Sequence, residues 1–396
     1  MIDNFNKIFV EIDHYSLPKY NQSICGDVFY SKKSDSDRRI VSVLADGLGS
    51  GIKANLLATL TSTMAAKFIL DFKDPKVAAE TIIKTLTVCK ERKISYSSFA
   101  IVDVDSTGSC RAIEYENPEI FVIREGKEIT INKKRIPIKS RYRKNSFLNY
   151  SEFYCELGDR IVFFTDGITQ AGIGSKQYPL GWGKDNAVQY MLKIIEENSS
   201  ISARELSRKI TQKANALNQY IPKDDTTCAV VYYRLPRKLL VLTGPPLSKD
   251  KDKEFAALAT NFQGRKVICG GTTAKIIARE LDRNLRVNLN DVFEDVAPIS
   301  EMNGIDLITE GAITLSKALD CVNGEYFENR KNHPVKLLTN ILLESDIIEF
   351  AVGSKINEAH QEPNMPIELG FRRLLIKKIA RALEEKYLKK VSIKYF

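Results

Sequence analysis

Short runs of alternating or continuous apolar residues dominate the first part of the chain, and Gly, Asn, Asp or Pro residues separate them. Such runs predict β-strands, whereas apolar residues spaced three and four positions apart predict helices. The strands are expected at residues 5–15, 24–30, 39–45, 96–104, 109–116, 119–124, 161–165 and 228–233, and the helices at about 52–70, 75–90, 185–197 and 202–219.

The pattern changes near Leu235-Pro236-Arg237. Beyond this point, short apolar strands are each followed by a loop containing Gly or Thr and then by an amphipathic helix. Repeated units of this kind are typical of a parallel α/β sheet. With 396 residues, the chain is also too long for one ordinary core. The sequence therefore predicts two domains, residues 1–236 and residues 237–396, of which the second is a smaller Rossmann-like α/β domain.

Composition narrows the class of protein. No apolar run approaches the roughly 20 residues that a membrane span needs, and the first ten residues lack a signal-peptide core. We therefore expect a cytoplasmic protein that does not bind membranes. The seven cysteines form no Cys-x-x-Cys pair, and the chain has only three histidines. These counts argue against a disulfide framework, a zinc cluster and a histidine-rich metal site.

The formal charge of +9 includes a basic patch between Lys133 and Lys144. Such a patch could bind nucleic acid or a phosphorylated acidic partner. However, no interleaved platform of aromatic residues accompanies these charges, as one does in sites for single-stranded nucleic acid. A solvated hairpin is the favoured interpretation, and we do not expect nucleic acid to be a partner.

Acidic residues occur where several apolar strands begin or end. Asp46 is followed by Gly47 at the end of one predicted strand, and Asp166 is followed by Gly167 at the end of another. One Asp-Gly pair alone would indicate a turn. The repetition, together with Asp27 and the adjacent Asp224 and Asp225, favours a cation site instead, because carboxylates entering an apolar core are costly without a positive partner.

Carboxylates and a backbone carbonyl are the ligands that Mg²⁺ and Mn²⁺ prefer. Two such ions can activate a water molecule for attack on a phosphoryl group. A calcium-binding EF-hand is the rival interpretation, but its ligands lie within one 12-residue loop. The acidic residues here are spread over about two hundred positions, which excludes that loop.

Four motifs carry a resemblance to a known family. In chain order they are Cys-Gly-Asp-Val-Phe-Tyr at 25–30, Ala-Asp-Gly-Leu-Gly-Ser-Gly at 45–51, Gly-Asp-Arg-Ile-Val-Phe-Phe-Thr-Asp-Gly at 158–167 and Asp-Asp-Thr-Thr at 224–227. Together they resemble the SpoIIE/RsbU branch of the metal-dependent (PPM) protein serine/threonine phosphatases. The resemblance covers residues 1 to about 236 and implies an αββα sandwich of two antiparallel sheets. With the second domain, the expected fold class is α+β.

The resemblance also implies roles for individual residues. Asp27, Asp46, Asp166 and Asp224 are the implied catalytic residues, and two Mn²⁺ or Mg²⁺ ions are the implied cofactors. Asp46 would bridge the ions with Asp27 beside both, and the Gly47 carbonyl would be a further ligand. Asp166 and Asp224 would hold the second ion, with Asp225 in support. The turn Asn117-Pro118-Glu119 departs from the family pattern, which bears on substrate preference more than on the chemistry.

These observations lead to one main functional hypothesis and two alternatives. The main hypothesis is a phosphatase that hydrolyses phosphoserine or phosphothreonine on a regulatory protein. The first alternative is a ligand-sensing regulatory scaffold whose phosphatase domain is weak or inactive. The second is a metal-dependent nuclease, and only the basic patch supports this alternative.

The second domain has a candidate ligand site of its own. Loops at the carboxyl edge of a parallel sheet, beside helix N-termini, favour an anionic ligand. The domain could therefore sense a small anionic ligand, dock a partner protein or join two copies of the chain into a homodimer. The candidate residues for the ligand are Gly270, Gly271, Thr272, Thr273, Glu310 and Gly311.

Overall fold

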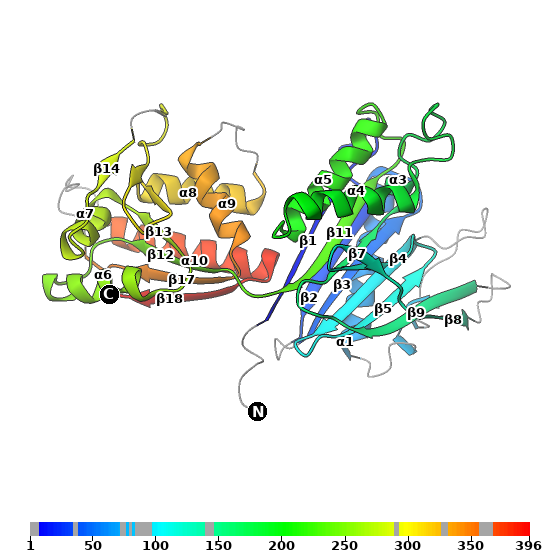
Figure 1. The fold of residues 1–396 in the computed structure, drawn as a ribbon, viewed down its shortest axis with the longest axis horizontal. Helices are drawn as coiled ribbons and strands as arrows, with labels where there is room; N and C mark the ends of the chain where they lie inside the picture. The colour runs from blue at the N-terminus through cyan, green and yellow to red at the C-terminus, as the bar shows by residue number, and fades with distance from the viewer. Residues whose placement is uncertain are drawn as a thin grey trace. The chain divides into compact units, whose positions relative to one another are not determined.

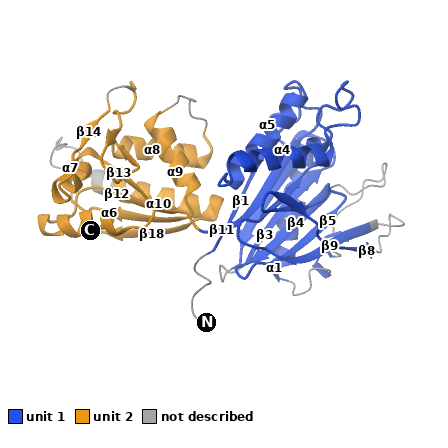
Figure 2. Ribbon diagram, in the orientation of Figure 1, with its two compact units in different colours: residues 1–235 blue, residues 236–396 orange. Residues whose placement is uncertain are grey.

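The computed structural model of the chain describes residues 8–34, 39–71, 77–78, 81–83, 97–138, 146–288, 293–325, 332–355 and 367–396. The chain separates into two compact units, Met1–Leu235 and Pro236–Phe396 (Figure 2). Most of the helix predicted at residues 75–90 lies outside the described residues. Unit 1 and unit 2 denote these two parts below.

Unit 1 is built on two antiparallel sheets (Figure 1). The first sheet has the strand order β1-β11-β10-β6-β7, and the second has the order β2-β3-β4-β5-β9-β8. The strands of the first sheet are β1 (Phe9–Leu17), β6 (Phe121–Arg124), β7 (Lys127–Ile129), β10 (Arg160–Phe164) and β11 (Thr226–Arg234). Those of the second are β2 (Asp27–Lys33), β3 (Arg39–Gly47), β4 (Ser97–Asp105), β5 (Ser109–Tyr115), β8 (Lys133–Ile138) and β9 (Ser146–Tyr154).

Helices cover the outer faces of both sheets in unit 1. Helices α4 (Gly183–Glu197) and α5 (Ala203–Leu217) share one apolar core with the first sheet. Helix α1 (Gly51–Asp71) shares a second core with the other sheet, and the short α3 (Asp166–Thr169) directly follows β10. Between the sheets, the rings of Phe29 on β2 and Phe163 on β10 lie 6.3 Å apart. This layering confirms the predicted αββα sandwich.

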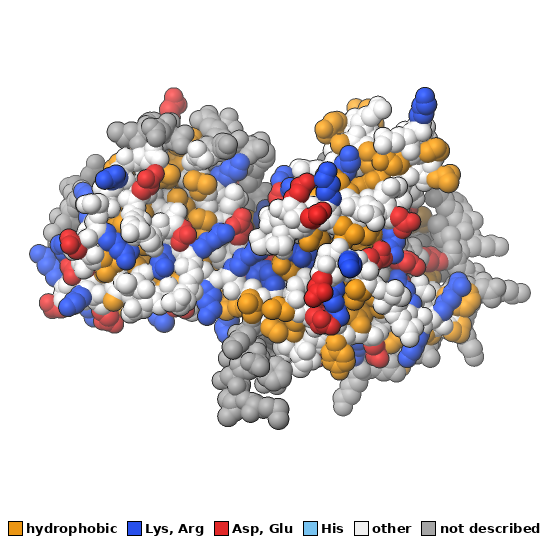
Figure 3. Space-filling model, in the orientation of Figure 1, with side chains coloured by type: hydrophobic (Ala, Val, Ile, Leu, Met, Phe, Trp, Pro, Cys, Tyr) orange, Lys and Arg blue, Asp and Glu red, His pale blue; other side chains and the backbone are white. Residues whose placement is uncertain are grey.

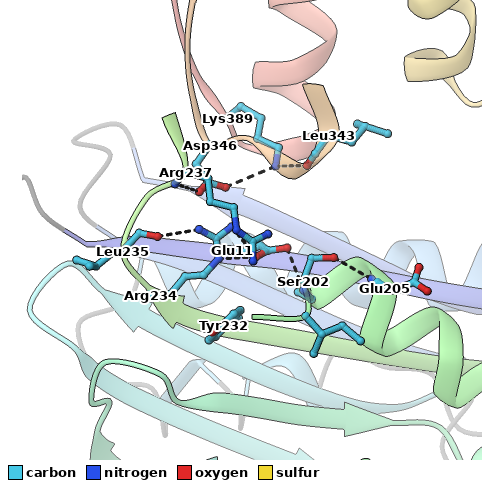
Figure 4. A network of polar contacts seen from close by, with 12 residues as sticks. Glu11, Ser202, Glu205, Tyr232, Arg234, Leu235, Arg237, Leu343, Asp346 and Lys389 are labelled. Carbon is cyan, nitrogen blue, oxygen red and sulfur yellow. Dashed lines mark hydrogen bonds and ion pairs between the residues drawn. The ribbon is translucent and has the colours of Figure 1, made fainter. Parts of the chain in front are cut away.

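A buried ion pair ties α5 to the first sheet of unit 1 (Figure 4). Arg234 on β11 donates a hydrogen bond from Nε to Oε2 of Glu11 on β1 at 2.7 Å. The Nη2 atom of Arg234 lies 2.6 Å from the same oxygen and completes the ion pair. The other carboxylate oxygen of Glu11 accepts the backbone N–H of Ala203 at 2.9 Å. Because that N–H belongs to the first turn of α5, the carboxylate fixes where the helix starts on the sheet.

Unit 2 contains a mixed sheet in the order β14-β15-β16-β13-β12-β17-β18. The strands from β16 to β18 in this order run parallel, whereas β14 and β15 add an antiparallel edge. Strands β14, β15 and β18 were not predicted from the sequence. The strands are β12 (Lys238–Thr243), β13 (Arg265–Cys269), β14 (Arg286–Val287), β15 (Ser300–Glu301), β16 (Leu307–Thr309), β17 (Ile347–Val352) and β18 (Lys390–Tyr395).

Alternate residues of the central strand β12 face opposite sides of this sheet. Leu240 and Leu242 pack with α6 (Asp252–Asn261) and α7 (Gly271–Glu280). Leu239 and Val241 pack on the other side with the remaining helices, which are α8 (Ala312–Asn323), α9 (Pro334–Glu344) and α10 (Ile367–Tyr387). Helix α6 begins at Asp252, directly after a 3₁₀ turn at Lys249–Lys251. The α/β character of this part of the chain is thus as predicted.

The first residues of unit 2 are held by a buried aspartate (Figure 4). Asp346 accepts the backbone N–H of Arg237 at 2.6 Å, and the Lys389 ammonium lies 3.8 Å from its other oxygen. Lys389 also donates to the Leu343 carbonyl at 2.7 Å. In the described part of the chain, no helix is both long and apolar enough to cross a membrane.

Candidate active site

Two of the predicted acidic residues face each other across neighbouring strands. Asp27 is the first residue of β2 and Asp46 lies next to the end of β3, and the antiparallel register pairs them directly. Asp27 is buried, with an exposed fraction of 4%. Its Oδ2 accepts a hydrogen bond from the Thr165 hydroxyl at 2.8 Å, whereas its Oδ1 is buried without a hydrogen-bond partner among the described residues.

Thr165 connects the two sheets at this point. It follows β10, and its hydroxyl oxygen accepts the backbone N–H of Thr227 on β11 at 3.0 Å. The same hydroxyl donates to Asp27 on the other sheet. Since one hydroxyl can both donate and accept, Thr165 fixes the distance between the ends of β2, β10 and β11.

Two glycines let main-chain segments approach each other beside these carboxylates. A Cβ on Gly47 would overlap the Ala54 carbonyl of α1, and a Cβ on Gly167 would overlap the Asp225 carbonyl. The Asp-Gly order found twice in the sequence therefore has a packing reason at both positions. Asp166 is the first residue of α3, so the close contact of Gly167 places it next to the Asp224-Asp225 segment.

Asp225 holds the loop that joins β1 to β2. Its Oδ1 accepts the backbone N–H of Lys19 at 3.0 Å, and its other oxygen lies against Gly26. The side chain is 4% exposed. Tyr20 adds a second link between these segments, because its N–H donates to the Pro222 carbonyl at 2.9 Å.

Burial and mutual repulsion change the acidity of the carboxylates. Burial raises the pKa of Asp27 to about 7 and that of Asp46 to about 9, and the charges of neighbouring aspartates act in the same direction. The hydrogen bond from Thr165 opposes this rise at Asp27. Burial also raises the pKa values of Asp166 and Asp224. Burial and the charges of neighbouring carboxylates thus both disfavour the ionised forms of these four side chains.

The donor set suits a hard divalent cation. The predicted side chains offer only oxygen atoms, and the unpartnered Oδ1 of Asp27 is a buried acceptor. As they stand, no three Asp, Glu, His or Cys side chains in the described ranges are gathered closely enough to hold a metal ion. The ligands would therefore close around a cation as it neutralises their repulsion.

The structure also brings together the two loops of the candidate ligand site in unit 2. Gly270 follows β13, its N–H donates to the Thr309 carbonyl at 2.9 Å, and a Cβ on Gly311 would lie 3.6 Å from the Gly270 Cα. However, Glu310 already accepts the N–H groups of Ile313 and Thr314 in the first turn of α8. An anion would thus meet a carboxylate at α8, which leaves the start of α7 as the better position. The ligand role of these residues remains a prediction.

Part of the basic patch has partners within the fold. Lys133 pairs with Glu114 at 2.8 Å, and the Arg135 guanidinium lies 4.1 Å from the centre of the Phe147 ring. Residues 139–145 lie outside the described part of the chain. On the face drawn in Figure 3, basic side chains lie among acidic and apolar ones. Lys133 and Arg135 thus have local partners within the fold, and the solvated hairpin stays a prediction.

The contacts of Thr165 and Lys19 were not predicted from the sequence. Thr165 lies inside a motif that was recognised for its aspartate, and a hydroxyl at the end of an apolar strand was the available signal. Lys19 follows β1 in a polar turn and carries no comparable signal. Its place beside Asp225 becomes visible only from the pairing of β1 with β11.

A model of a known protein family matches most of unit 1. The family model for Stage II sporulation protein E (SpoIIE) matches residues 36–234. No curated protein matches the chain. Among solved structures, the chain is similar to the SpoIIE phosphatase domain from Bacillus subtilis, with 17% identity, a TM-score of 0.44, and coverage of 58% of this chain and 94% of that one.

Two further solved structures are similar to this chain. For RsbX in complex with magnesium, the identity is 18% and the TM-score 0.38, with 56% of this chain and 94% of that chain covered. For the RsbU and RsbW domains of a Mycobacterium tuberculosis protein, the identity is 15% and the TM-score 0.45, with 63% of this chain and 68% of that chain covered. Because the SpoIIE family model spans half of the 396 residues, the chain belongs to the SpoIIE family of protein serine/threonine phosphatases, as its motifs predicted.

Proposed function

We propose that this phosphatase acts on phosphoserine or phosphothreonine of a regulatory protein and uses water as the attacking group. The observation that supports this proposal is the pairing of Asp27 with Asp46 at the ends of β2 and β3, where Thr165 also ties in the end of β10. The end of β10 in the other sheet is thus held beside this pair of carboxylates. No histidine or cysteine takes part in these contacts, which favours hydrolysis without a protein nucleophile.

Two Mn²⁺ or Mg²⁺ ions are the cofactors in this proposal. Asp27, Asp46, Asp166 and Asp224 would hold them together with the Gly47 carbonyl, and Asp225 would support the set. Bound ions would lower the pKa of a water molecule and balance the charge of the phosphoryl oxygens. The chain's own contribution is to fix its carboxylates: Thr165 orients Asp27, and the close contacts of Gly47 and Gly167 keep the strand ends together.

A regulatory scaffold with a weak or inactive phosphatase domain is the second candidate. The observation in its favour is that the described side chains do not already form a group of three metal ligands. A phosphatase whose ligands do not close around an ion would bind a partner or ligand without turnover. Direct measurement of Mn²⁺ binding separates this candidate from the enzyme.

Asp46→Asn provides the decisive test. The substitution removes a metal ligand and keeps the shape of the side chain. It also removes a carboxylate whose pKa is raised by burial and by its neighbours, so the metal-free variant should be at least as stable as the wild type. Hydrolysis of an aryl phosphate and of a phosphothreonine peptide is measured with and without Mn²⁺. The exposed Asp185, in the first turn of α4, gives the matched control Asp185→Asn.

We expect Mn²⁺-dependent turnover by the wild type and by Asp185→Asn, and a loss of at least about a thousandfold in Asp46→Asn, consistent with removal of a catalytic metal ligand. Turnover by Asp46→Asn at the wild-type rate would contradict the assigned site. Calorimetry that detects no Mn²⁺ binding to the wild-type chain would instead favour the scaffold.

A further inference from the structure

Three loops of unit 1 lie side by side near the paired carboxylates. They are residues 18–26 between β1 and β2, residues 170–182 between α3 and α4, and residues 218–225 between α5 and β11. The first loop is bound to the third, because the Tyr20 N–H donates to the Pro222 carbonyl at 2.9 Å. The second is bound to the third as well, because the Lys223 ammonium donates to the Ile173 carbonyl at 3.0 Å.

Each of these loops adjoins a predicted member of the metal site. The first directly precedes Asp27, the second follows the short helix α3 that begins at Asp166, and the third contains Asp224 and Asp225. A protein substrate whose phosphoryl group enters the site therefore lays the residues on either side of that group over these loops.

The loops present apolar side chains to solvent. Single exposed apolar residues are ordinary on a protein surface, whereas a group of them beside a site marks an interaction surface. Leu180 is 91% exposed and Tyr220 is 72% exposed, so both are far from any core. The rim surface denotes the five exposed apolar side chains of these loops, which are Tyr20, Ile173, Leu180, Tyr220 and Ile221.

The exposure of Leu180 is imposed by a closely packed loop. The next residue, Gly181, has a φ of 92°, and a Cβ on it would lie 2.5 Å from the Thr169 carbonyl oxygen. Trp182 is buried, and its N–H donates to the Ala171 carbonyl at 2.9 Å. The end of the loop is thus anchored in the core, while Leu180 is held in solvent two residues earlier.

Tyr220 occupies an unfavourable backbone conformation. Its φ is 62° and that of Gln219 is 55°, in the left-handed region that bulky residues rarely adopt. The Tyr220 N–H donates to the Asn215 carbonyl at 2.9 Å, which holds this turn at the end of α5. The chain therefore combines a strained turn with an exposed aromatic ring, and burial of that ring by a partner would offset the cost of its exposure.

We propose that the rim surface docks the phosphoprotein substrate by burying apolar side chains that flank its phosphoserine or phosphothreonine. This inference rests on the proposed phosphatase function and adds a substrate class to it. The argument for this occupant is continuity, because the same three loops carry or adjoin the predicted metal ligands and present the rim surface. The contacts are non-covalent and act on substrate affinity. A small aryl phosphate has no flanking residues and does not use them.

The test compares two phosphothreonine peptides and an aryl phosphate as substrates. Leucine and phenylalanine flank the phosphothreonine in one peptide, whereas serine and glycine flank it in the other. Leu180→Ser and Tyr220→Ser remove the two most exposed members of the rim surface. Leu157→Ser is the matched control, because Leu157 is 58% exposed and lies before β10, whose opposite end leads to Asp166. Steady-state kinetics with Mn²⁺ give kcat and KM, and sedimentation velocity gives the oligomeric state.

We expect the wild type to hydrolyse the apolar-flanked peptide with a kcat/KM about tenfold above that of the other peptide, mainly through a lower KM. In each rim variant, the kcat/KM for the apolar-flanked peptide, taken relative to that for the aryl phosphate, should fall about five- to tenfold. Leu157→Ser should match the wild type with all three substrates. Because the aryl phosphate serves as the internal reference, damage to the metal site would not produce this change in ratio.

Equal kcat/KM values for the two peptides in the wild type would overturn this role, and so would an unchanged ratio in both rim variants. A wild-type dimer that Leu180→Ser or Tyr220→Ser converts to a monomer would also overturn it, because the occupant would then be a second copy of the chain.

The proposed function is judged separately, by Mn²⁺-dependent turnover of the aryl phosphate by the wild type. Turnover without a preference between the peptides keeps the phosphatase and rejects the docking surface. If the wild type hydrolyses none of the substrates, fluorescence anisotropy measures its binding of the two labelled peptides. Preferential binding of the apolar-flanked peptide that the rim variants lose would keep the docking surface and reject hydrolysis, whereas binding without preference would reject both.

Discussion

Replacing Thr165 by valine tests how the two sheets control the metal centre. Valine has the same shape as threonine but no hydroxyl. The Thr165 hydroxyl is fully buried, donates to Asp27 at 2.8 Å and accepts the Thr227 N–H at 3.0 Å. The substitution therefore removes two hydrogen bonds at once and leaves the packing of the strand end in place.

The expected size of the effect follows from these two bonds. The Thr165 hydroxyl donates to the buried carboxylate of Asp27, and a hydrogen bond to a charged group contributes about 1.5–3 kcal/mol to stability. The amide of Thr227 would also be left buried without this acceptor, at a cost of about 1–3 kcal/mol. Only the first bond orients a metal ligand. For Mn²⁺ affinity we therefore expect a loss of about ten- to a hundredfold, as for other groups that orient metal ligands.

Titration calorimetry with Mn²⁺ provides the assay, with Thr165→Ser as the conservative variant and Thr169→Val as the control. The Thr169 hydroxyl donates only to the backbone carbonyl of Asp166, so its removal should leave Mn²⁺ affinity within about threefold of the wild type. Serine at position 165 should restore most of the affinity lost with valine. If Thr165→Val binds Mn²⁺ as tightly as the wild type, Asp27 is not oriented through this hydroxyl and the reasoning is refuted.

Two further predictions concern the stability of unit 1, which can be followed through the fluorescence of Trp182, the only tryptophan in the chain and one that is buried in this unit. Glu11→Ala leaves Arg234 buried without its carboxylate and should lower the free energy of unfolding in urea by about 3 kcal/mol, whereas a loss below 1 kcal/mol would contradict the importance of the pair. Burial lowers the pKa of His14 from 6.5 to about 4, with a further contribution from Arg204. The unfolded chain therefore takes up a proton in this window before the folded chain does, and stability falls as the pH falls from about 6.5 to 4. His14→Phe, which can keep the stacking on Phe29, should reduce the loss of stability between pH 7 and pH 5 by about 1–2 kcal/mol, and identical pH profiles would rule out this contribution.

The sandwich could be predicted because its strands are buried in continuous runs. Every residue of β10 and of β11 is buried, and the sequence contains an uninterrupted apolar segment in each, at residues 161–164 and 228–233. The elements that were missed lack this signal. In β18, buried positions are absent and exposed ones alternate with half-buried ones, because it is the edge strand of its sheet. Its pairing with β17 depends on tertiary structure and leaves no strong local pattern.

The candidate site was predictable as a set of residue types but not as a set of contacts. Asp27 and Asp46 were expected in one cation site, and the register pairs them directly. The contacts of Thr165 and Lys19 were not predicted, because their partners lie far away in the chain. Thr165 meets a carboxylate 138 residues away, and the Lys19 amide meets one 206 residues away. No local spacing rule contains such partners.

The adjacent Asp224 and Asp225 show why residue types alone do not reveal which contacts each residue makes in a site. In the sequence they form one acidic pair before an apolar strand. In the fold, one carboxylate oxygen of Asp225 is occupied by the Lys19 N–H and the other lies against Gly26, so this side chain holds the loop between β1 and β2. Burial raises the pKa of Asp224, and the positive charge of Lys19 opposes this rise. The Lys19 segment is thus tied to Asp225 through its backbone N–H. This hydrogen bond couples the position of the loop between β1 and β2 to Asp225, the residue proposed to support the metal ligands.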